Sequence, residues 1–184
     1  MAELKMLAID LGASSGRGIV GKFDGNRLTL EENHRFPNEP VITAGSFNWD
    51  ILRIYHEIKD SIRKCALSDD RNIASIAIDT WGVDYGFLDK NGKLIGNPYH
   101  YRDDRTAGVP ELAFNTVSQD DLYGVTGTQT MNFNTIFQLI AEKRDNPEIF
   151  DIAKRLLFVP DLLNYFLTGV QENEYTIAST GSLL

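Results

Sequence analysis

The stretch from Leu4 to Phe23, LKMLAIDLGASSGRGIVGKF, restricts the possible folds more than any other part of the sequence. An apolar run ends in Asp10, a turn rich in glycine and serine follows, and a second run carries Arg17 among glycines and β-branched residues. The second run lacks helical spacing, so the pattern predicts a strand, a turn and a strand. A carboxylate at a strand end, beside small residues whose amides can face a ligand, suits a magnesium-bound polyphosphate.

The same stretch argues against the two commonest phosphate-binding loops. A Walker loop and a dinucleotide-binding fingerprint both lead into a helix whose N-terminus holds the phosphate. Here the glycines lead into a strand-like run, so a bound anion would be held by hairpin amides, serine hydroxyls, arginine and metal. The structural alternative is that Asp10 forms an Asx-turn and the glycines only close a hairpin.

Composition indicates a soluble globular protein with one domain. The chain has 184 residues, 42% hydrophobic and 24% charged, which allows one good core but not two domains of ordinary size. A net charge of −8 without clustered Lys and Arg argues against nucleic acid as the main partner. No long apolar stretch and no signal-peptide pattern occurs, so we expect no membrane association and a cytoplasmic location. Cys65 is the only cysteine, which excludes an intrachain disulfide.

Periodicity and cap residues predict the remaining elements. Arg27–Phe36 extends the first two strands into a meander, and an amphipathic helix begins after Asn48 or Asp50 and ends near Leu67. Further along we expect a strand over 72–79, a hairpin with arms at 85–88 and 94–95 around Asn91-Gly92, a short helix capped by Ser118 and stopped by Gly124 and Gly127, a helix over 134–143, a strand over 155–159, and a helix bracketed by Pro160 and Gly169.

A second candidate site follows the strand over 72–79, where Asp79 leads into Thr80-Trp81-Gly82-Val83-Asp84. Open α/β sheets bind ligands at strand ends. Gly82 would let the backbone approach a ligand, Trp81 offers a flat apolar face, and Asp84 can accept hydrogen bonds from hydroxyls. A structural turn with a core tryptophan explains the pattern equally well. The charged cluster at 101–105 either forms structural ion pairs or borders a ligand, and we expect ion pairs because alternating charges usually satisfy each other.

These strings together resemble the FGGY carbohydrate kinases, which have the actin/hexokinase/Hsp70-type ATPase fold. That ribonuclease H-like fold is an α/β fold with a mixed five-stranded sheet and flanking helices. Within the family the similarity is strongest to members that act on L-rhamnulose, and it is co-linear over essentially the whole chain. The strings that carry it are Asp10-Leu11-Gly12-Ala13-Ser14-Ser15-Gly16-Arg17, Ile78-Asp79-Thr80-Trp81-Gly82-Val83-Asp84, Tyr101-Arg102-Asp103 with Arg105, and Phe133-Asn134-Thr135.

The resemblance implies ATP and Mg²⁺ as cofactors and a ketose as substrate, phosphorylated at O1 if it is L-rhamnulose. Another sugar kinase of the family, for xylulose or fuculose, and a non-catalytic sugar-binding domain are the alternatives. An actin- or Hsp70-like ATPase is disfavoured because such proteins lack a counterpart of Trp81-Gly82. The implied contacts are the ATP phosphates with Ala13, Ser14, Ser15, Gly16 and Arg17, the magnesium ion with Asp10, through water, and the sugar with Gly82, Trp81 and Asp84.

The resemblance also implies that part of the active site lies elsewhere. Family members have two domains, and the catalytic aspartate, a second phosphate loop and the adenosine pocket follow the region matched here. We therefore expect residues 1–184 to form an N-terminal domain that is incomplete at its C-terminus. The general base is expected beyond Leu184, no catalytic residue is assigned within this chain, and the chain alone is expected to be inactive.

Overall fold

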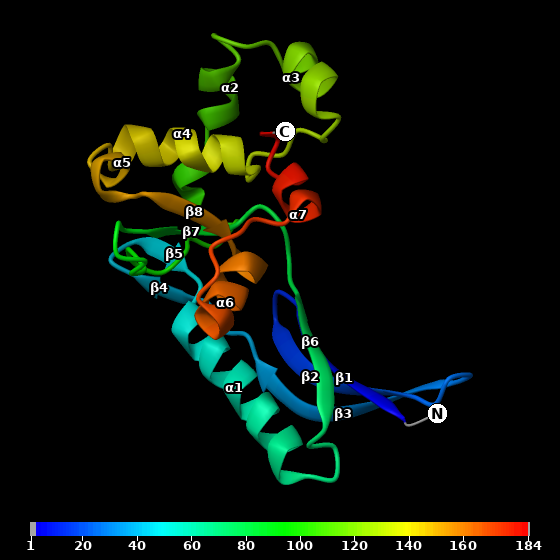
Figure 1. Ribbon diagram of the computed structural model, residues 1–184. Helices are drawn as coiled ribbons and strands as arrows, with labels where there is room; N and C mark the ends of the chain where they lie inside the picture. The colour runs from blue at the N-terminus through cyan, green and yellow to red at the C-terminus, as the bar shows by residue number, and fades with distance from the viewer. Residues whose placement is uncertain (1–2, 184) are drawn as a thin grey trace. The chain divides into compact units, whose positions relative to one another are not determined.

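The structure is a computed structural model that describes residues 3–183 (Figure 1). Its internal contacts divide the chain into two compact units. Unit 1 consists of the residues up to Glu39 together with Asp50–Trp81, and unit 2 consists of Pro40–Trp49 together with the residues from Gly82 onward. Across residues 3–183, no helix is long and apolar enough to cross a membrane.

Unit 1 is built on a mixed sheet with the strand order β3-β2-β1-β6. The first three strands form the expected antiparallel meander, and β6 pairs in parallel with β1. These four strands belong to the mixed sheet of the expected fold class; a fifth strand does not occur in this sheet within residues 3–183. The strand bounds are β1 Leu4–Leu11, β2 Ser15–Phe23, β3 Leu28–Pro37 and β6 Ile73–Asp79.

Helix α1, Ile51–Leu67, packs against β3 and β2 of this sheet, as Figure 1 shows. Of the two expected cap residues, the structure selects Asp50, whose side chain accepts a hydrogen bond from the Arg53 amide. The buried face of the helix carries Ile54, Ile58 and Cys65 at helical spacing, so Cys65 is a core residue as expected. Burial of each large aliphatic side chain contributes about 1.5–3 kcal/mol to the stability of this layer.

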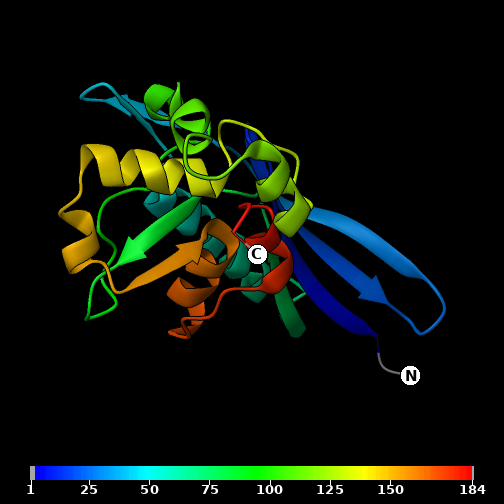
Figure 2. The same cartoon turned by 90° about the horizontal axis from the view of Figure 1, so that it is seen from above.

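Unit 2 combines short strands with several helices. Strands β7 and β8 pair antiparallel, and Figure 2 shows them side by side as a green and an orange arrow. One core cluster centres on Tyr85, Phe87 and Phe158, and another on Val109 and Phe137. The bounds are β4 Val41–Thr43, β5 Ser46–Asn48, β7 Tyr85–Leu88, the 3₁₀ helix η1 Asp104–Thr106, α2 Val109–Ala113, α3 Gln119–Thr126, α4 Thr135–Asp145, α5 Ile149–Ile152, β8 Arg155–Phe158, α6 Val159–Thr168 and α7 Tyr175–Ser179.

Several predicted cap residues of unit 2 are confirmed. Ser118 accepts a hydrogen bond from the Asp121 amide at the start of α3, and Gly127 ends that helix in the left-handed region. Pro160 lies in the first turn of α6, and Gly169, also left-handed, ends it. The prediction that Gly124 stops a helix was wrong, because Gly124 lies inside α3 and has helical neighbours on both sides.

The predicted hairpin at residues 85–95 needs a correction. Strand β7 forms, but residues 93–95 fold back on it without forming a strand. A bridge between Leu88 and Leu94 is flanked by hydrogen bonds from the Asp89 amide to the Lys93 carbonyl and from the Ile95 amide to the Phe87 carbonyl, both 2.9 Å. The ladder partner of β7 is β8 instead, about seventy residues later, since its register pairs Tyr85 with Phe158. The β4–β5 hairpin and helix α7 were not predicted at all.

Candidate functional site

The β1–β2 turn, residues 12–14, is a short exposed loop held rigidly at its base. The Gly12 amide donates to the Ser15 carbonyl at 2.9 Å and closes the hairpin. Asn38, at the end of β3, donates from its amide to the Ser14 carbonyl at 3.0 Å and from Nδ2 to the Gly12 carbonyl at 2.9 Å. Because Gly12, Ala13 and Ser14 are exposed, the loop presents its polar backbone to a ligand while Asn38 fixes its shape.

Three charged residues lie across neighbouring strands next to this turn. The ladder pairs Asp10 with Arg17 on β2 and with Asp79 on β6. Residues opposite each other in a ladder share a face of the sheet, so these side chains lie on one face at the strand ends. The Asp10 carboxylate accepts from Arg17 Nη2 at 2.6 Å and from Nε at 2.8 Å, and both side chains are about two-fifths exposed. The structure thus brings together two of the predicted phosphate and metal residues.

The residues predicted for the sugar come from the segment between β6 and β7. Trp81 is half-buried and belongs to unit 1, where the Thr80 hydroxyl donates to the Trp81 carbonyl at 2.8 Å. Gly82 and Asp84 belong to unit 2. Gly82 is half-buried.

Asp84 is the centre of a buried polar network in unit 2. Only 1% of its surface is exposed. Its Oδ2 accepts from Trp49 Nε1 at 2.7 Å and from the Tyr101 amide at 3.1 Å, and its Oδ1 accepts from Gln138 Nε2 at 2.8 Å. Trp49 in turn stacks on His100 with ring centroids 4.1 Å apart. A carboxylate with this many donors orients the residues around it, which the sequence pattern had not indicated.

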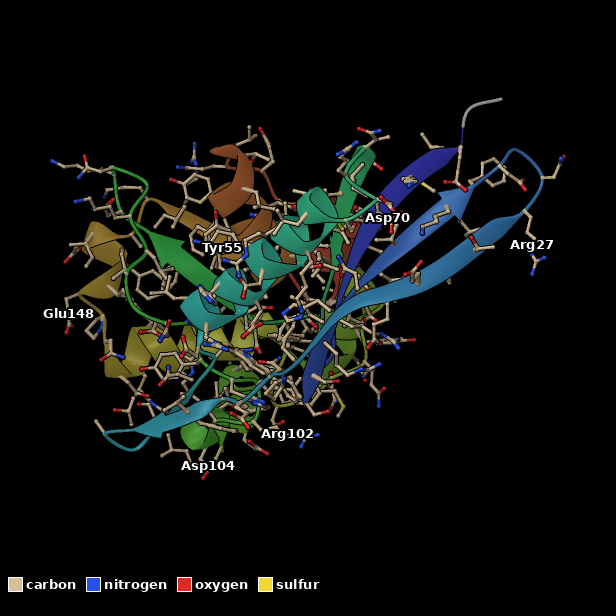
Figure 3. All side chains as sticks on the ribbon, turned by 90° about the horizontal axis from the view of Figure 1, so that it is seen from below. Arg27, Tyr55, Asp70, Arg102, Asp104 and Glu148 are labelled. Carbon is tan, nitrogen blue, oxygen red and sulfur yellow. The ribbon has the colours of Figure 1, made fainter. Side chains whose placement is uncertain are left out.

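In the charged cluster at residues 101–105, the expected structural pairing is confirmed for Arg105, whose partners lie far along the chain. Arg105 lies 2.5 Å from the Glu142 carboxylate, donates to Gln138 Oε1 at 2.9 Å and stacks over Tyr99. Arg102 and Asp104 lie beside the β4–β5 hairpin in Figure 3 and border an open cavity of about 670 Å³. The Glu142 pairing joins η1 to α4 and so stiffens the scaffold behind the Asp84 network.

Three residues of these sites escaped prediction from the sequence. Asn38 stands between two prolines in a segment that reads only as the end of a strand, and Gln138 is one of several polar residues of its helix. Thr180 lies in a stretch without any clear signal. Each acts through a hydrogen bond to a residue at least 26 positions away. Such contacts exist only after the chain has folded, so local patterns carry no trace of them.

Comparison with known families accounts for nearly the whole chain. A family profile described as the FGGY family of carbohydrate kinases, N-terminal domain, matches residues 5–184. The chain is 48% identical over 177 residues to the rhamnulokinase of Bacteroides thetaiotaomicron, covering 96% of this chain and 36% of that protein. It is 45% identical over 178 residues to the rhamnulokinase of Oceanobacillus iheyensis, covering 97% and 38%. The chain therefore spans little more than a third of the length of these relatives.

Solved structures share the fold at much lower sequence identity. A xylulose kinase from Lactobacillus acidophilus matches 98% of this chain and 36% of its own, with a TM-score of 0.85 and 19% identity. A gluconate kinase from the same organism matches 100% and 37%, with a TM-score of 0.86 and 18% identity. At this identity the likeness establishes the fold class and no more.

Proposed function

Because the chain belongs to the FGGY family of carbohydrate kinases, we propose that the full-length protein transfers the γ-phosphoryl group of MgATP to a ketose. The proposed ketose is L-rhamnulose, and the product is L-rhamnulose 1-phosphate. The observation that carries this proposal is an identity of 42–48% over nearly the whole chain to proteins named rhamnulokinase. The chain covers 36–38% of those proteins, so the activity is proposed for the longer polypeptide.

The β1–β2 turn supports the ATP side of the proposal. We assign the ATP phosphates to Ala13, Ser14, Ser15, Gly16 and Arg17. The exposed turn offers backbone amides and serine hydroxyls, and Arg17 offers a guanidinium that suits bidentate contact with phosphate oxygens. The Asp10 carboxylate that now pairs with Arg17 keeps that side chain at the mouth of the turn.

The donor set beside the turn also fits a magnesium ion. Mg²⁺ usually keeps several waters and takes one or two carboxylates together with phosphate oxygens. Asp10 supplies one partly exposed carboxylate, and residues 3–183 contain no cluster of three or more His, Cys, Asp or Glu side chains that could hold a metal by themselves. We therefore assign Asp10 to the water shell of the ion. When bound, the metal would neutralise charge on the transferred phosphoryl group.

The segment between β6 and β7 supports the sugar side. We propose that Gly82 and Trp81 line the ketose pocket through a bare backbone and an apolar ring. Asp84 is assigned to the same pocket, and its buried network supports a role in holding Trp49 and Gln138 in place for the sugar. A cytoplasmic location for the protein stays a prediction from composition.

The general base is proposed to lie in the part of the protein beyond this chain. Phosphoryl transfer depends on positioning and on charge stabilisation, with a carboxylate that accepts the proton of the attacking hydroxyl. Asp10 is paired with Arg17, and Asp84 is buried and saturated with donors. Neither geometry suits a base, and the family resemblance gives this role to none of Asp10, Asp79 and Asp84. The 184-residue chain should therefore bind ligands without turning them over.

Calorimetry on the 184-residue chain tests this function. We expect saturable binding of MgATP and of L-rhamnulose, and no L-rhamnulose 1-phosphate. Arg17→Ala should weaken MgATP binding about 10- to 100-fold, the equivalent of one or two charge-assisted hydrogen bonds, and leave ketose binding unchanged. Arg27→Ala is the matched control, because Arg27 lies at the far tip of the β2–β3 hairpin (Figure 3). Phosphorylation of L-rhamnulose by the chain alone would contradict the proposal.

The alternatives predict different results in the same experiment. A family member specific for another ketose should bind D-xylulose or L-fuculose more tightly than L-rhamnulose. A non-catalytic sugar-binding domain should bind a ketose with no response to nucleotide or magnesium, and Arg17→Ala should then change nothing.

A further inference from the structure

Val83, the residue directly after Gly82, has a backbone conformation that β-branched residues rarely adopt. Its φ is +68°. The amide of Asp84 donates to the carbonyl of Gly82 at 2.9 Å, which closes a three-residue turn around Val83. This is the rare form of γ-turn with a positive central φ. Strain of this kind persists only where surrounding contacts hold it, and it concentrates at ligand sites.

Two threonines from distant segments of unit 2 hold the backbone of Val83. The Val83 amide donates to Thr180 Oγ1 at 3.1 Å, and the same hydroxyl donates onward to the Ile177 carbonyl at 2.7 Å. On the other side, Thr135 Oγ1 donates to the Val83 carbonyl at 2.7 Å. Both polar groups of the strained residue are therefore satisfied by side chains, and a relaxed conformation of the turn would break these bonds.

Thr180 also explains why position 82 is glycine. The φ of Gly82 is outside the left-handed region, so its conformation does not demand glycine. A Cβ at this position would lie 2.7 Å from Thr180 Oγ1 and 3.1 Å from both Thr180 Cβ and Cγ2. Thr180 thus occupies the space that a side chain at 82 would need, and keeps the Gly82 backbone bare.

The segment that carries Thr180 is itself fixed against the start of α4. Asn134 Nδ2 donates to the Thr180 carbonyl at 3.2 Å, and the Ile136 amide donates to the Gly181 carbonyl at 3.0 Å. A Cβ on Gly181 would lie 2.7 Å from Thr135 Oγ1, so the backbone at Gly181 packs tightly against the first residue of α4. The Thr180 hydroxyl consequently has a defined position from which to hold Val83.

We propose that Thr180 is a positioning residue for the ketose site: its hydroxyl holds Val83 in the strained turn and thereby sets the backbone of Gly82. This inference rests on the proposed function, in which Gly82 lines the ketose pocket. It predicts that the Thr180 hydroxyl, rather than the bulk of the side chain, controls ketose affinity.

Nuclear magnetic resonance of the 184-residue chain tests this inference, with L-rhamnulose as the probe. Thr180→Val keeps the shape and removes the acceptor, so we expect a changed φ-dependent coupling at Val83 and about tenfold weaker L-rhamnulose binding. Thr180→Ser keeps the hydroxyl and should restore both within about twofold. Thr168→Val, which removes an exposed hydroxyl bonded to the Asn164 carbonyl, is the control and should change neither.

Stability measurements give a second test that needs no ligand. Gly82→Ala should lower the unfolding midpoint, and adding Thr180→Ala to it should recover part of the loss. Additive effects of the two substitutions would overturn the proposed contact. The positioning role of Thr180 would be contradicted if the Thr180→Val chain kept the φ-dependent coupling of Val83 unchanged, or if it bound the ketose with full affinity. If the unsubstituted chain does not bind the ketose, the proposed function fails; the Val83 coupling then still decides whether Thr180 positions the turn.

Discussion

Gly16 shows how one residue of a ligand-binding turn can be fixed by packing. It is the second residue of β2, just after the β1–β2 turn, and is buried. A Cβ at this position would lie 2.3 Å from Phe36 Cζ and 2.8 Å from Leu11 Cδ2, and both of those side chains are buried. Gly16 is therefore required by the core of unit 1 independently of any phosphate.

We expect Gly16→Ala to destabilise the chain by about 1–3 kcal/mol, because Phe36 and Leu11 must shift within a packed layer. Urea unfolding followed by circular dichroism measures this loss. Gly124→Ala is the matched control, since Gly124 lies inside α3 with nothing within 4 Å of the added Cβ. It should stabilise by up to about 1 kcal/mol through helix propensity. Equal stability of the two variants would show that the packing argument is wrong.

At the scale of elements, the β1–β2 turn depends on the end of a third strand. Asn38 is 95% buried and donates to two carbonyls of the turn. The turn therefore does not owe its shape to its own residues alone. A loop that must hold a polyphosphate in one geometry gains from such support, because a preorganised loop loses less entropy on binding.

Asn38→Asp should weaken this support with almost no change in size. The carboxylate cannot donate to the Gly12 carbonyl and places a charge at the buried position of Asn38, so we expect a destabilisation of about 1–3 kcal/mol. MgATP affinity should fall as well, and calorimetry measures it. Asn26→Asp, exposed at the β2–β3 hairpin, adds the same charge and serves as control. If the Asn38→Asp chain is less stable but binds MgATP with unchanged affinity, the shape of the turn does not contribute to nucleotide binding.

At the scale of the whole molecule, two buried groups oppose each other in the pH dependence of stability. Burial raises the pKa of Asp161 from 3.8 to about 6, and burial next to Arg102 lowers the pKa of His100 from 6.5 to about 4. As pH rises from about 4 to 6, the unfolded chain releases the Asp161 proton first, so stability falls. As pH falls from about 6.5 to 4, the unfolded chain protonates the histidine first, so stability falls in that direction.

Asp161→Asn removes the contribution of Asp161 to the pH dependence of stability and leaves that of His100. Asparagine can still accept the hydrogen bond from the Glu174 amide, but it carries no charge. We expect the variant to be more stable than the parent chain above pH 6, by up to about 3 kcal/mol, and to lose this advantage below pH 4. Thermal unfolding between pH 3 and 8 measures both limits. A constant difference across this range would mean that the Asp161 pKa is not raised.

Much of the fold could be predicted from the sequence because its signals are local. The alternation and glycine content of Leu4–Phe23 predicted a hairpin, the periodicity up to Leu67 predicted α1, and Ser118, Pro160 and Gly169 marked helix ends. The pairing of β7 with β8 was missed, since a ladder between strands so far apart in sequence depends on how the intervening helices fold. Short elements such as β4, β5 and α7 carry too few residues for a periodic signal.

The sequence by itself determined the family and the order of the main elements, and it is the source of the residues proposed for the ligands. Asp10 and Arg17 stand out because a carboxylate and a guanidinium flank a turn rich in glycine and serine, and Gly82 because a glycine lets the backbone approach a ligand. Only the tertiary structure decided how these residues are held. Asn38 supports the β1–β2 turn, and Asp84 accepts hydrogen bonds within a buried network. Thr180 holds Val83 from 97 positions away in the sequence. The physical reason is that a hydrogen bond between remote segments depends on distance and direction in the folded chain, and neither is encoded in neighbouring residues.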